Sequence, residues 1–402
     1  MISSLSRKVQ TLRRWLKAQR LLAPIIITFL RDWHRFIFFG KSRELTAKQH
    51  QARARRLTDA FEELGSTYIK LAQFLTTRPD LIPPIYVGEL ERLQDEVPPE
   101  DFEEVRPRIE DELGTLNVFD YFETEAISGA SIAQVHRAGI DGEDVAVKIR
   151  RPGLEDVVEA DLAIMGSFFP FLVWTLRKLG QESHAESLEG ITAELSKTIR
   201  EEMDFEREAG IMNELRHNFA RDGLDDRIIV PEPWDQYCTE SVLVMKWEPG
   251  VKVKHIDELE RRGHDLDEIV DAIADAYLHM AFTYDVFQAD PHQGNLAVND
   301  QGQAIIYDYG LAQRPPDELQ DSFTRLFVGV GMQDPDIVID AAKEMGAMDE
   351  SLDYQTLYEA TEIMIQDLAG EDLADADVEA IEKKVDETLY DYPMRFPQEI
   401  IL

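Results

Sequence analysis

The chain has 402 residues, 44% of them hydrophobic, which is enough to bury a sizeable core and to build two domains or one bilobal unit. It carries 42 Lys and Arg against 79 Asp and Glu, a formal net charge of −37. The acidic residues are not gathered in a tail, which excludes a disordered acidic activator. An acidic surface over an ordinary core indicates a halophile, because concentrated salt screens the self-repulsion. The single cysteine, Cys238, excludes an internal disulfide and a cysteine-cluster metal site, and it fits a reducing cytosol.

Residues 1–56 form a basic, apolar arm, with 14 Lys and Arg against 2 Asp and Glu, whereas the remaining residues carry 28 against 77. Its apolar runs, 21–30 and 36–39, are shorter than the ~20 residues of a bilayer span, and no small-residue cleavage site follows the first. Two interpretations stay open: an amphipathic helix on an anionic membrane surface, or a helix packed on the body of the protein. Nucleic-acid binding is disfavoured, because the acidic body would repel phosphates.

The next segment, residues 57–114, is predicted to be helical. Apolar residues at helical spacing predict two helices over 57–97, interrupted by the proline-rich stretch 78–84, and an acidic helix follows over 100–113. Lys70 and Gln73 share one face of the first helix, where the simpler interpretation is a solvated polar face.

After residue 114 the pattern changes to that of strands. A first strand over 118–127 leads into a loop of small residues, a second strand, the turn Asp141-Gly142 and a third strand that contains Val145-Ala-Val-Lys148. Small residues let backbone N–H groups approach phosphates, and the third strand is similar to the protein-kinase strand whose lysine pairs with them. The simpler alternative for Lys148 is a surface lysine at a strand end. No Walker motif occurs, and Gly329-Val-Gly331 is predicted to lie in a helix with a structural role.

Two helical segments follow. Residues 154–180 contain the apolar run 163–176, which Pro170 is expected to break and which is short enough to indicate a buried helix rather than a membrane span. A long polar helix is predicted over 186–217, with Asp204 and Glu208 on one side and Glu202 on another. A phosphate-binding lysine needs a glutamate from such a helix.

The remaining pattern is that of a hinge and a helical lobe. Strands over 228–230 and 241–247 are expected to pair and to end at the hinge Glu248-Pro-Gly250, followed by a helix over 266–287. From residue 316 onward the pattern is helical, and the apolar end 395–402 indicates a trimmed chain.

Between these parts lies the stretch 287–310, with Asp290 and Asn295 five positions apart and Asp308 thirteen further on. Leu296-Ala-Val298 and residues 304–307 flank a turn, which predicts a tight β-hairpin. The spacing resembles the catalytic loop and metal-binding segment of protein kinases. Oxygen ligands from Asn295 and Asp308 suit Mg²⁺, and Asp290 would orient or deprotonate the nucleophile. The simpler alternative is a buried hairpin with two solvated acids.

Together, the ordered motifs closely resemble the UbiB/AarF family of atypical protein-kinase-like proteins over roughly residues 57–400. They are Lys70-x-x-Gln73, Ala130–Ala138, Val145-Ala-Val-Lys148, Glu202-x-Asp204, Ala289-Asp-Pro-His-x-Gly-Asn295 and Asp308-Tyr-Gly310. The chain departs from the family pattern at Ala72 (glycine), Gln288 (often histidine), Gln293 (often proline) and Tyr309 (phenylalanine). None of these changes removes a phosphate or metal ligand, but Ala72 bears on how the extension packs and on substrate access.

The resemblance implies an α+β, bilobal kinase-like fold that binds ATP or ADP with Mg²⁺. Its site would comprise Asp290 and Lys148 in catalysis, Asn295 and Asp308 on the metal, and the family-motif residues Lys70, Gln73, Glu202 and Asp204, with Glu202 facing Lys70. The nucleotide would contact Lys148 and its partner Glu208, together with Ser128, Gly129, Ala130, Ser131, Ile132, Ala133, Met245 and Trp247. The units are the arm 1–56, the extension 57–114, a small lobe with inserted helices 115–248 and a large lobe 249–402.

The family implies an ATPase or a small-molecule or lipid kinase in isoprenoid-quinone or prenyl-lipid metabolism, with prenyl lipids or quinone precursors as partners. Two alternatives stay open: a conventional protein kinase, and a nucleotide-gated scaffold without turnover. The protein would be cytoplasmic and peripheral to the membrane, and many family members continue into C-terminal transmembrane helices.

Overall fold

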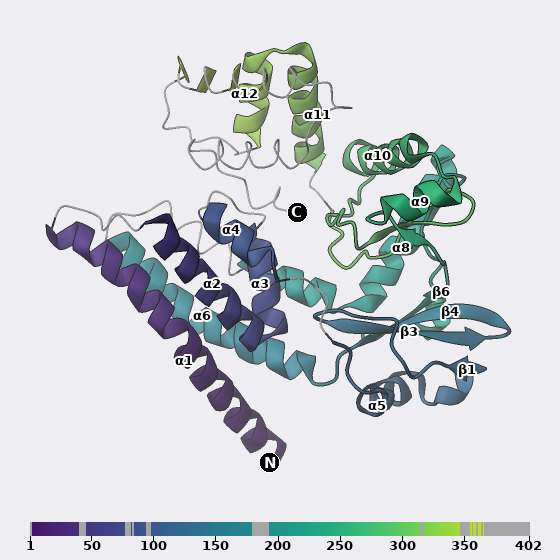
Figure 1. The fold of residues 1–402 in the computed structure, drawn as a ribbon, viewed down its shortest axis with the longest axis horizontal. Coiled ribbons are helices and arrows are strands. Elements are labelled where there is room, and N and C mark those ends of the chain that lie inside the picture. Colours follow the sequence, from purple (N-terminus) through teal and green to yellow (C-terminus); the bar gives the residue numbers. More distant parts are fainter. Residues whose placement is uncertain are drawn as a thin grey trace.

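The computed structural model describes residues 2–39, 46–76, 84–93, 98–178, 193–314 and 317–345, together with Ile82 and seven residues between 354 and 365. A group of long helices lies beside an antiparallel sheet, and a second, smaller sheet with its own helices lies beyond it (Figure 1). The combination of helices with two sheets confirms the predicted α+β class.

The helical group is held together by one apolar core. The helices of this group are α1 (Ile2–Phe39), α2 (Ala47–Leu64), α3 (Ser66–Thr76), α4 (Pro84–Leu90) and α6 (Leu154–Lys178). Phe61 and Tyr68 from the extension pack with Val158 and Leu162 of α6. Helix α6 therefore belongs spatially with the extension, although small-lobe strands precede it in the chain.

The prediction of two helices over 57–97 was wrong, because the described helical residues of this range belong to three, α2, α3 and α4. Gly65, with φ +87°, separates α2 from α3, and a positive φ of this kind is open to glycine at little cost. Helix α2 also begins earlier than expected, at Ala47, where Thr46 and Gln49 form a capping box.

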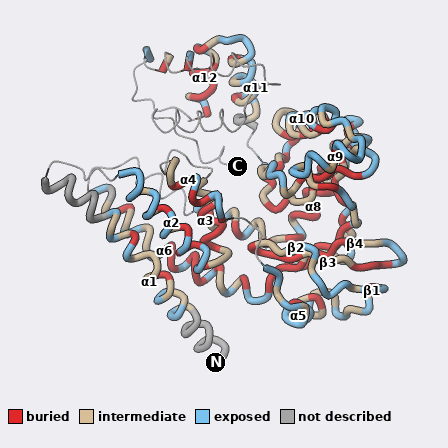
Figure 2. The backbone as a smooth tube through the Cα atoms, in the orientation of Figure 1, coloured by how far each residue is buried: buried red, intermediate tan, exposed pale blue. Residues whose placement is uncertain are grey.

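Part of the basic arm packs on the body. Arg14 on α1 donates two hydrogen bonds, of 2.7 and 2.6 Å, to the fully buried carboxylate of Asp161 on α6, and Ala18 is also buried. Much of the coloured part of α1 is intermediate or exposed (Figure 2). Its exposed residues include Trp15 and Leu16. The structure thus shows part of the arm packed on the body of the protein, and lipid binding by the arm stays a prediction.

Helix α6 differs from its prediction. It continues through Pro170 rather than breaking there, and its second half is only partly buried, since Phe171 is 59% and Trp174 57% exposed while Val173 is buried. By length and composition Leu154–Thr175 could cross a membrane, but a soluble protein's core helix passes the same test, so the finding is weak evidence.

The small-lobe sheet has the strand order β1-β3-β4-β6, with β2 also on β3. The strands are β1 (Tyr121–Phe122), β2 (Ser128–Gly129), β3 (Ala133–Ile140), β4 (Glu143–Arg150) and β6 (Val242–Lys246), all antiparallel. Asp141 and Gly142 both have positive φ, which suits the tight β3–β4 hairpin. One face of the sheet packs on α5 (Phe102–Leu113), which is the predicted acidic helix, and the other faces the large lobe.

The large lobe is built on a second sheet with the order β5-β9-β8-β7. Its strands are β5 (Ile228–Ile229), β7 (Val251–Lys252), β8 (Leu296–Val298) and β9 (Ala304–Ile306), and β8 and β9 form the predicted hairpin. Around them lie α8 (Phe205–Asp222), α9 (Ile256–Arg262) and α10 (Leu266–Phe282), with α11 (Asp317–Met332) and α12 (Pro335–Glu344) further along. Gly329 and Gly331 lie within α11, as expected.

Three sequence expectations fail in this region. The strand at 228–230 pairs with β9 and not with 241–247, which joins the small-lobe sheet instead. The expected first strand over 118–127 is reduced to β1, because a short 3-10 helix occupies Leu116–Val118. The long helix over 186–217 is interrupted at Met203 and Asp204, and residues 186–192 and 395–402 lie outside the described residues. The domain boundaries stay predictions.

Candidate active site

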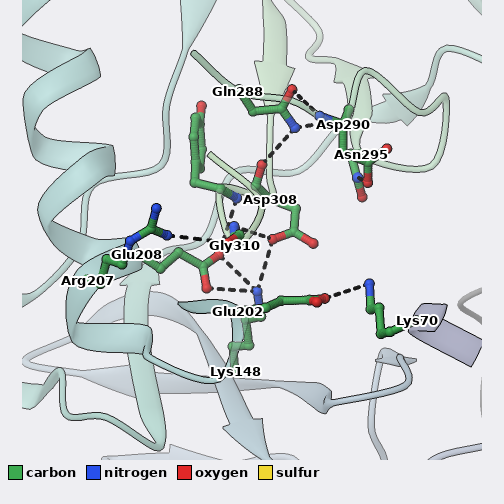
Figure 3. A network of polar contacts seen from close by, with 11 residues as sticks. Lys70, Lys148, Glu202, Arg207, Glu208, Gln288, Asp290, Asn295, Asp308 and Gly310 are labelled. Atoms are coloured by element: carbon green, nitrogen blue, oxygen red, sulfur yellow. Dashed lines mark hydrogen bonds and ion pairs between the residues drawn. The ribbon is translucent and has the colours of Figure 1, made fainter. Parts of the chain in front are cut away.

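Lys148 points into the space between the lobes because successive side chains of a strand lie on alternate faces of the sheet. Val147 and Ile149, its neighbours on β4, are buried in the core under α5, so the lysine points to the opposite face. There its Nζ lies 2.8 and 2.9 Å from the two carboxylate oxygens of Glu208 and 3.1 Å from Oδ1 of Asp308 (Figure 3). Burial alone would lower the pKa of Lys148, but the charges of Asp308 and Glu208 more than offset this and raise it.

Glu208 comes from the first turn of α8 and is 1% exposed. Burial raises its pKa to about 7, against the opposing effect of the Lys148 ammonium. The same carboxylate accepts a hydrogen bond from the backbone N–H of Tyr309 at 3.3 Å. One side chain therefore ties the lysine strand to the Asp308-Tyr-Gly310 segment, in the way predicted for the helix glutamate.

Asp308 is held ionised. Burial would raise the pKa of its carboxyl, but the Lys148 ammonium and the N–H of Gly310, which donates to Oδ1 at 3.1 Å, lower it well below its usual value. An ionised, partly buried carboxylate is a suitable ligand for a hard cation.

The catalytic-loop residues lie across from the lysine. The amide nitrogen of Asn295 donates to Oδ2 of Asp290 at 2.7 Å, which leaves the amide oxygen of Asn295 as its candidate metal ligand. Among the described residues no group of three or more His, Cys, Asp or Glu could hold a metal by itself. Asn295 and Asp308 fit Mg²⁺ even so, because this ion is commonly held by one or two protein oxygens together with water and substrate phosphates.

Gln288, which is 1% exposed, joins the two acidic segments. Its amide nitrogen donates to the carbonyls of Asp290 at 2.8 Å and Asp308 at 3.0 Å (Figure 3). Its oxygen accepts a hydrogen bond from the hydroxyl of Tyr277. The sequence marked Gln288 only as a departure from the family pattern. Its position directly before the Asp290 loop was the signal that could have identified it.

The predicted phosphate loop is short and held in place. Ser128 and Gly129 pair with β3, and the Ala130 N–H donates to the Ala133 carbonyl at 2.7 Å. Ser131 and Ile132 are buried, and the Ser131 carbonyl accepts a hydrogen bond from Ser66 at the start of α3. The side chain of Ile132 packs in the helical core, so only its backbone could serve a nucleotide.

Met245 and Trp247 lie at the end of β6, next to the hinge. Met245 is opposite Ala146 in the sheet, on the same face as Lys148. Cζ of the Arg137 guanidinium lies 5.5 Å from the centroid of the Trp247 ring. Both residues therefore extend the face that carries the lysine, as a nucleotide base would require.

The family-motif residues connect the extension to this site. Nζ of Lys70 lies 2.6 Å from Oε1 of Glu202, the predicted partner, and Glu202 packs close to Gly310 (Figure 3). Gln73 lies on the same helix face as Lys70. Asp204 differs from its expectation: it does not share a helix face with Glu208 but caps α8, accepting a hydrogen bond from the Arg207 N–H at 3.0 Å.

Sequence reasoning missed Arg207. Its guanidinium donates to the carbonyls of Gly310 and Ala312, so the first turn of α8 holds the Asp308-Tyr-Gly310 segment through both Arg207 and Glu208. In so acidic a segment an arginine beside the partner glutamate was a usable signal.

Two lobes of this construction, with a lysine strand facing an acidic loop across a short hinge, define the class of protein-kinase-like domains. Within that class the chain belongs to the ABC1 atypical kinase-like family, whose domain description matches residues 92–342. This confirms the resemblance to the UbiB/AarF proteins.

Relatives support the family assignment. The chain is 30% identical over 362 residues to the uncharacterized protein sll1770 of Synechocystis, covering 89% of this chain and 61% of that protein. It is 32% identical to the chloroplastic Activity of bc1 complex kinase 8 of Arabidopsis thaliana (77% and 40%) and 32% identical to the probable protein kinase UbiB of Pasteurella multocida (74% and 58%). This chain thus spans only 40 to 61% of the length of these relatives.

One solved structure, Rv3197 of Mycobacterium tuberculosis in complex with erythromycin, aligns with a TM-score of 0.49 and 20% identity, over 89% of this chain and 96% of that one. A structural similarity with this TM-score and sequence identity is too weak to support any inference about the present chain.

Proposed function

We propose that the chain is an Mg²⁺-dependent, ATP-binding phosphotransferase or ATPase that supports isoprenoid-quinone or prenyl-lipid metabolism at a membrane. The observation that carries the proposal is the contact of Lys148 with both Glu208 and Asp308, directly across from the hydrogen-bonded pair of Asp290 and Asn295. Phosphoryl transfer needs this kind of positioning and charge neutralisation more than covalent chemistry.

Each polar group has a role in this proposal. Lys148 would bind the α- and β-phosphates while Glu208 keeps it oriented. Asp308 and Asn295 would hold Mg²⁺, which neutralises charge on the phosphates when it is bound. Asp290 would accept the proton of the attacking hydroxyl or water, so that the oxygen can attack the terminal phosphorus and release the nucleoside diphosphate.

The extension favours a small or lipid-linked acceptor over a protein. Helix α3 contributes Lys70 to the site itself, through the 2.6 Å contact with Glu202, and Ser66 to the phosphate loop. A protein substrate would have to displace these contacts. The names of the relatives, UbiB and Activity of bc1 complex kinase, support the quinone connection for this chain by analogy.

The proposed partners are prenyl lipids or quinone precursors, and an anionic membrane surface through residues 1–56. Exposed Leu12, Trp15, Leu16 and Phe29 on the basic helix α1 support the membrane contact. Nucleic acid is not a proposed partner.

The test is ATP hydrolysis in molar KCl with Mg²⁺, with and without anionic liposomes. Asp290→Asn is expected to abolish turnover and to keep nucleotide affinity, whereas Asp141→Asn, the same change in an exposed turn, should match the wild type. Equal turnover in Asp290→Asn and the wild type would contradict the enzyme proposal. Tight nucleotide binding without turnover in any condition would favour the scaffold. A labelled-phosphate screen against proteins and lipids then separates a protein kinase from a lipid kinase.

A further inference from the structure

Lys252 is a cation of the large lobe that none of the motifs includes. It ends the short strand β7, directly after the hinge, and pairs with Ala297 on β8. Its neighbours Val251 and Val253 pack into the apolar core of the lobe. Because side chains alternate along a strand, Lys252 points to the other side.

On that side Lys252 touches both segments that carry the candidate metal ligands. Its Nζ donates to the carbonyl of Gly294 at 2.5 Å, directly before Asn295. It also lies 4.2 Å from the ring centroid of Tyr307, directly before Asp308. The Tyr307 hydroxyl donates to the hinge carbonyl of Glu248 at 2.7 Å, so the lysine, the hinge and the metal-binding loop form one connected group.

The charge of Lys252 is poorly compensated. Within the described parts of the chain it forms no salt bridge, although the protein as a whole is strongly acidic. Burial, helped by the nearby Lys254, lowers its pKa to about 8, against the opposing effect of Asp308. A half-buried ammonium whose direct contacts are a carbonyl and an aromatic ring gains stability from an anion. The hydrogen bond to Gly294 uses only one of the three N–H donors of the Lys252 ammonium.

We infer that Lys252 binds a phosphate oxygen of the nucleotide from the large-lobe side, opposite Lys148. It would keep its bond to Gly294 and direct a second N–H to the ligand, which places one cation on each side of the phosphate chain. The inference rests on the proposed nucleotide binding and adds a phosphate-specific contact to it.

The competing explanation is that Lys252 only supports the loop through Gly294. The two explanations differ in how the loss of the cation depends on the ligand. A phosphate contact weakens binding of AMP, ADP and ATP but not of adenosine. A loop support weakens binding of all four ligands alike, because every one of them needs the same loop geometry.

The experiment measures the dissociation constants of adenosine, AMP, ADP and ATP by calorimetry, with Mg²⁺, for the wild type, Lys252→Met and Lys252→Arg. Lys254→Met is the matched control, since it removes a lysine charge from an exposed position two residues away. We expect Lys252→Met to bind the phosphorylated ligands about tenfold more weakly and adenosine unchanged, with partial recovery in Lys252→Arg. The control should differ little from the wild type.

An equal loss for adenosine and ADP, or no loss for any ligand, would overturn the inference while leaving nucleotide binding intact. If the wild type itself binds none of the four ligands, the proposed function fails, and the inference fails with it. Thermal melting and circular dichroism of each variant establish that it is folded. Should Lys252→Met not fold, Lys252→Gln takes its place in the ligand series.

Discussion

Lys70 of α3 and Glu202, on the helical segment before α8, form an ion pair of 2.6 Å in which the side chains are only 8% and 12% exposed. The pair joins the helical extension to the immediate surroundings of Asp308. The positive charge of Lys70 also helps to lower the pKa of the Asp308 carboxyl. The extension is therefore electrostatically part of the site rather than a separate neighbour.

The first prediction concerns the stability of this pair. Lys70→Met or Glu202→Gln leaves one nearly buried charge without its partner, so each single change should destabilise the fold by about 3 kcal/mol. The double variant should lose clearly less than the sum, because neither charge is then left alone. Urea unfolding of the four proteins measures the coupling. The exposed pair Glu258–Arg262 on α9 is the control, and its two single changes should be nearly additive. Additive losses for Lys70→Met and Glu202→Gln would refute the prediction.

The second prediction concerns pH. Glu208, with a pKa of about 7, becomes protonated as the pH falls through 7, and a neutral carboxyl no longer pairs with Lys148. The kcat/KM for ATP should therefore fall on the acid side of pH 7, and Glu208→Gln should be weakly active with a flatter acid limb. An acid limb of the same midpoint in Glu208→Gln would show that another group titrates.

The stability effect of Glu208 has the opposite sign. Its pKa is raised above the ordinary value of 4.5, so the folded protein holds this proton more tightly than the unfolded chain does. Its contribution to the free energy of unfolding is fully present below pH 4.5 and is lost as the pH rises through 7. Between pH 5 and 7 the wild type should lose stability relative to Glu208→Gln, as thermal melts at matched pH values would record.

The third prediction separates structure from chemistry at Asp204. Because this residue caps α8, Asp204→Ala should lower the free energy of unfolding by about 1 kcal/mol, and Asp204→Asn should be close to the wild type. Activity at low temperature should follow stability in both variants. A large loss of activity in a fully folded Asp204→Asn would instead assign Asp204 a direct role at the site.

The fourth prediction concerns the docking of the basic arm. Asp161→Asn removes the buried counter-charge of Arg14, so α1 should detach more readily, with about 3 kcal/mol lost from its docking. Limited proteolysis within α1 and binding to anionic liposomes should both increase. The control is Glu159→Gln, on the same helix as Asp161, which breaks the exposed pair of Glu159 with Arg200 and should change neither measurement. Unchanged liposome binding in a variant whose α1 is released would contradict the arm as a membrane contact.

Much of the site could be predicted from short-range patterns. The hairpin between Asn295 and Asp308 and the strand of Lys148 depend on alternation and on fixed spacing, which adjacent residues determine, whereas the choice of Glu208 came from the family resemblance. The structure brings these residues together as expected, whereas their chemical roles await experiment.

The predictions failed where a local pattern competes with distant packing. A helical period runs through Gly65 and through residues 186–217, but Gly65 ends α2 with a positive φ and Asp204 caps the start of α8. The strand at Ile228 looked like a partner for Val242, yet register and burial place them in different sheets. Arg207 and Lys252 act through carbonyls of residues that are distant along the chain, and no local pattern indicates such bonds.

The sequence by itself determined the order of the motifs and the acidic character of the chain, because these depend on composition and spacing, and the fold class followed from the family resemblance that those motifs carry. Only the tertiary structure decided that α6 packs with the extension, that Arg207 holds the Asp308-Tyr-Gly310 segment and that Lys252 faces the metal-binding segments. Those relationships depend on which surfaces bury each other and where charges can find partners, and both are settled by long-range packing rather than by neighbours in the chain.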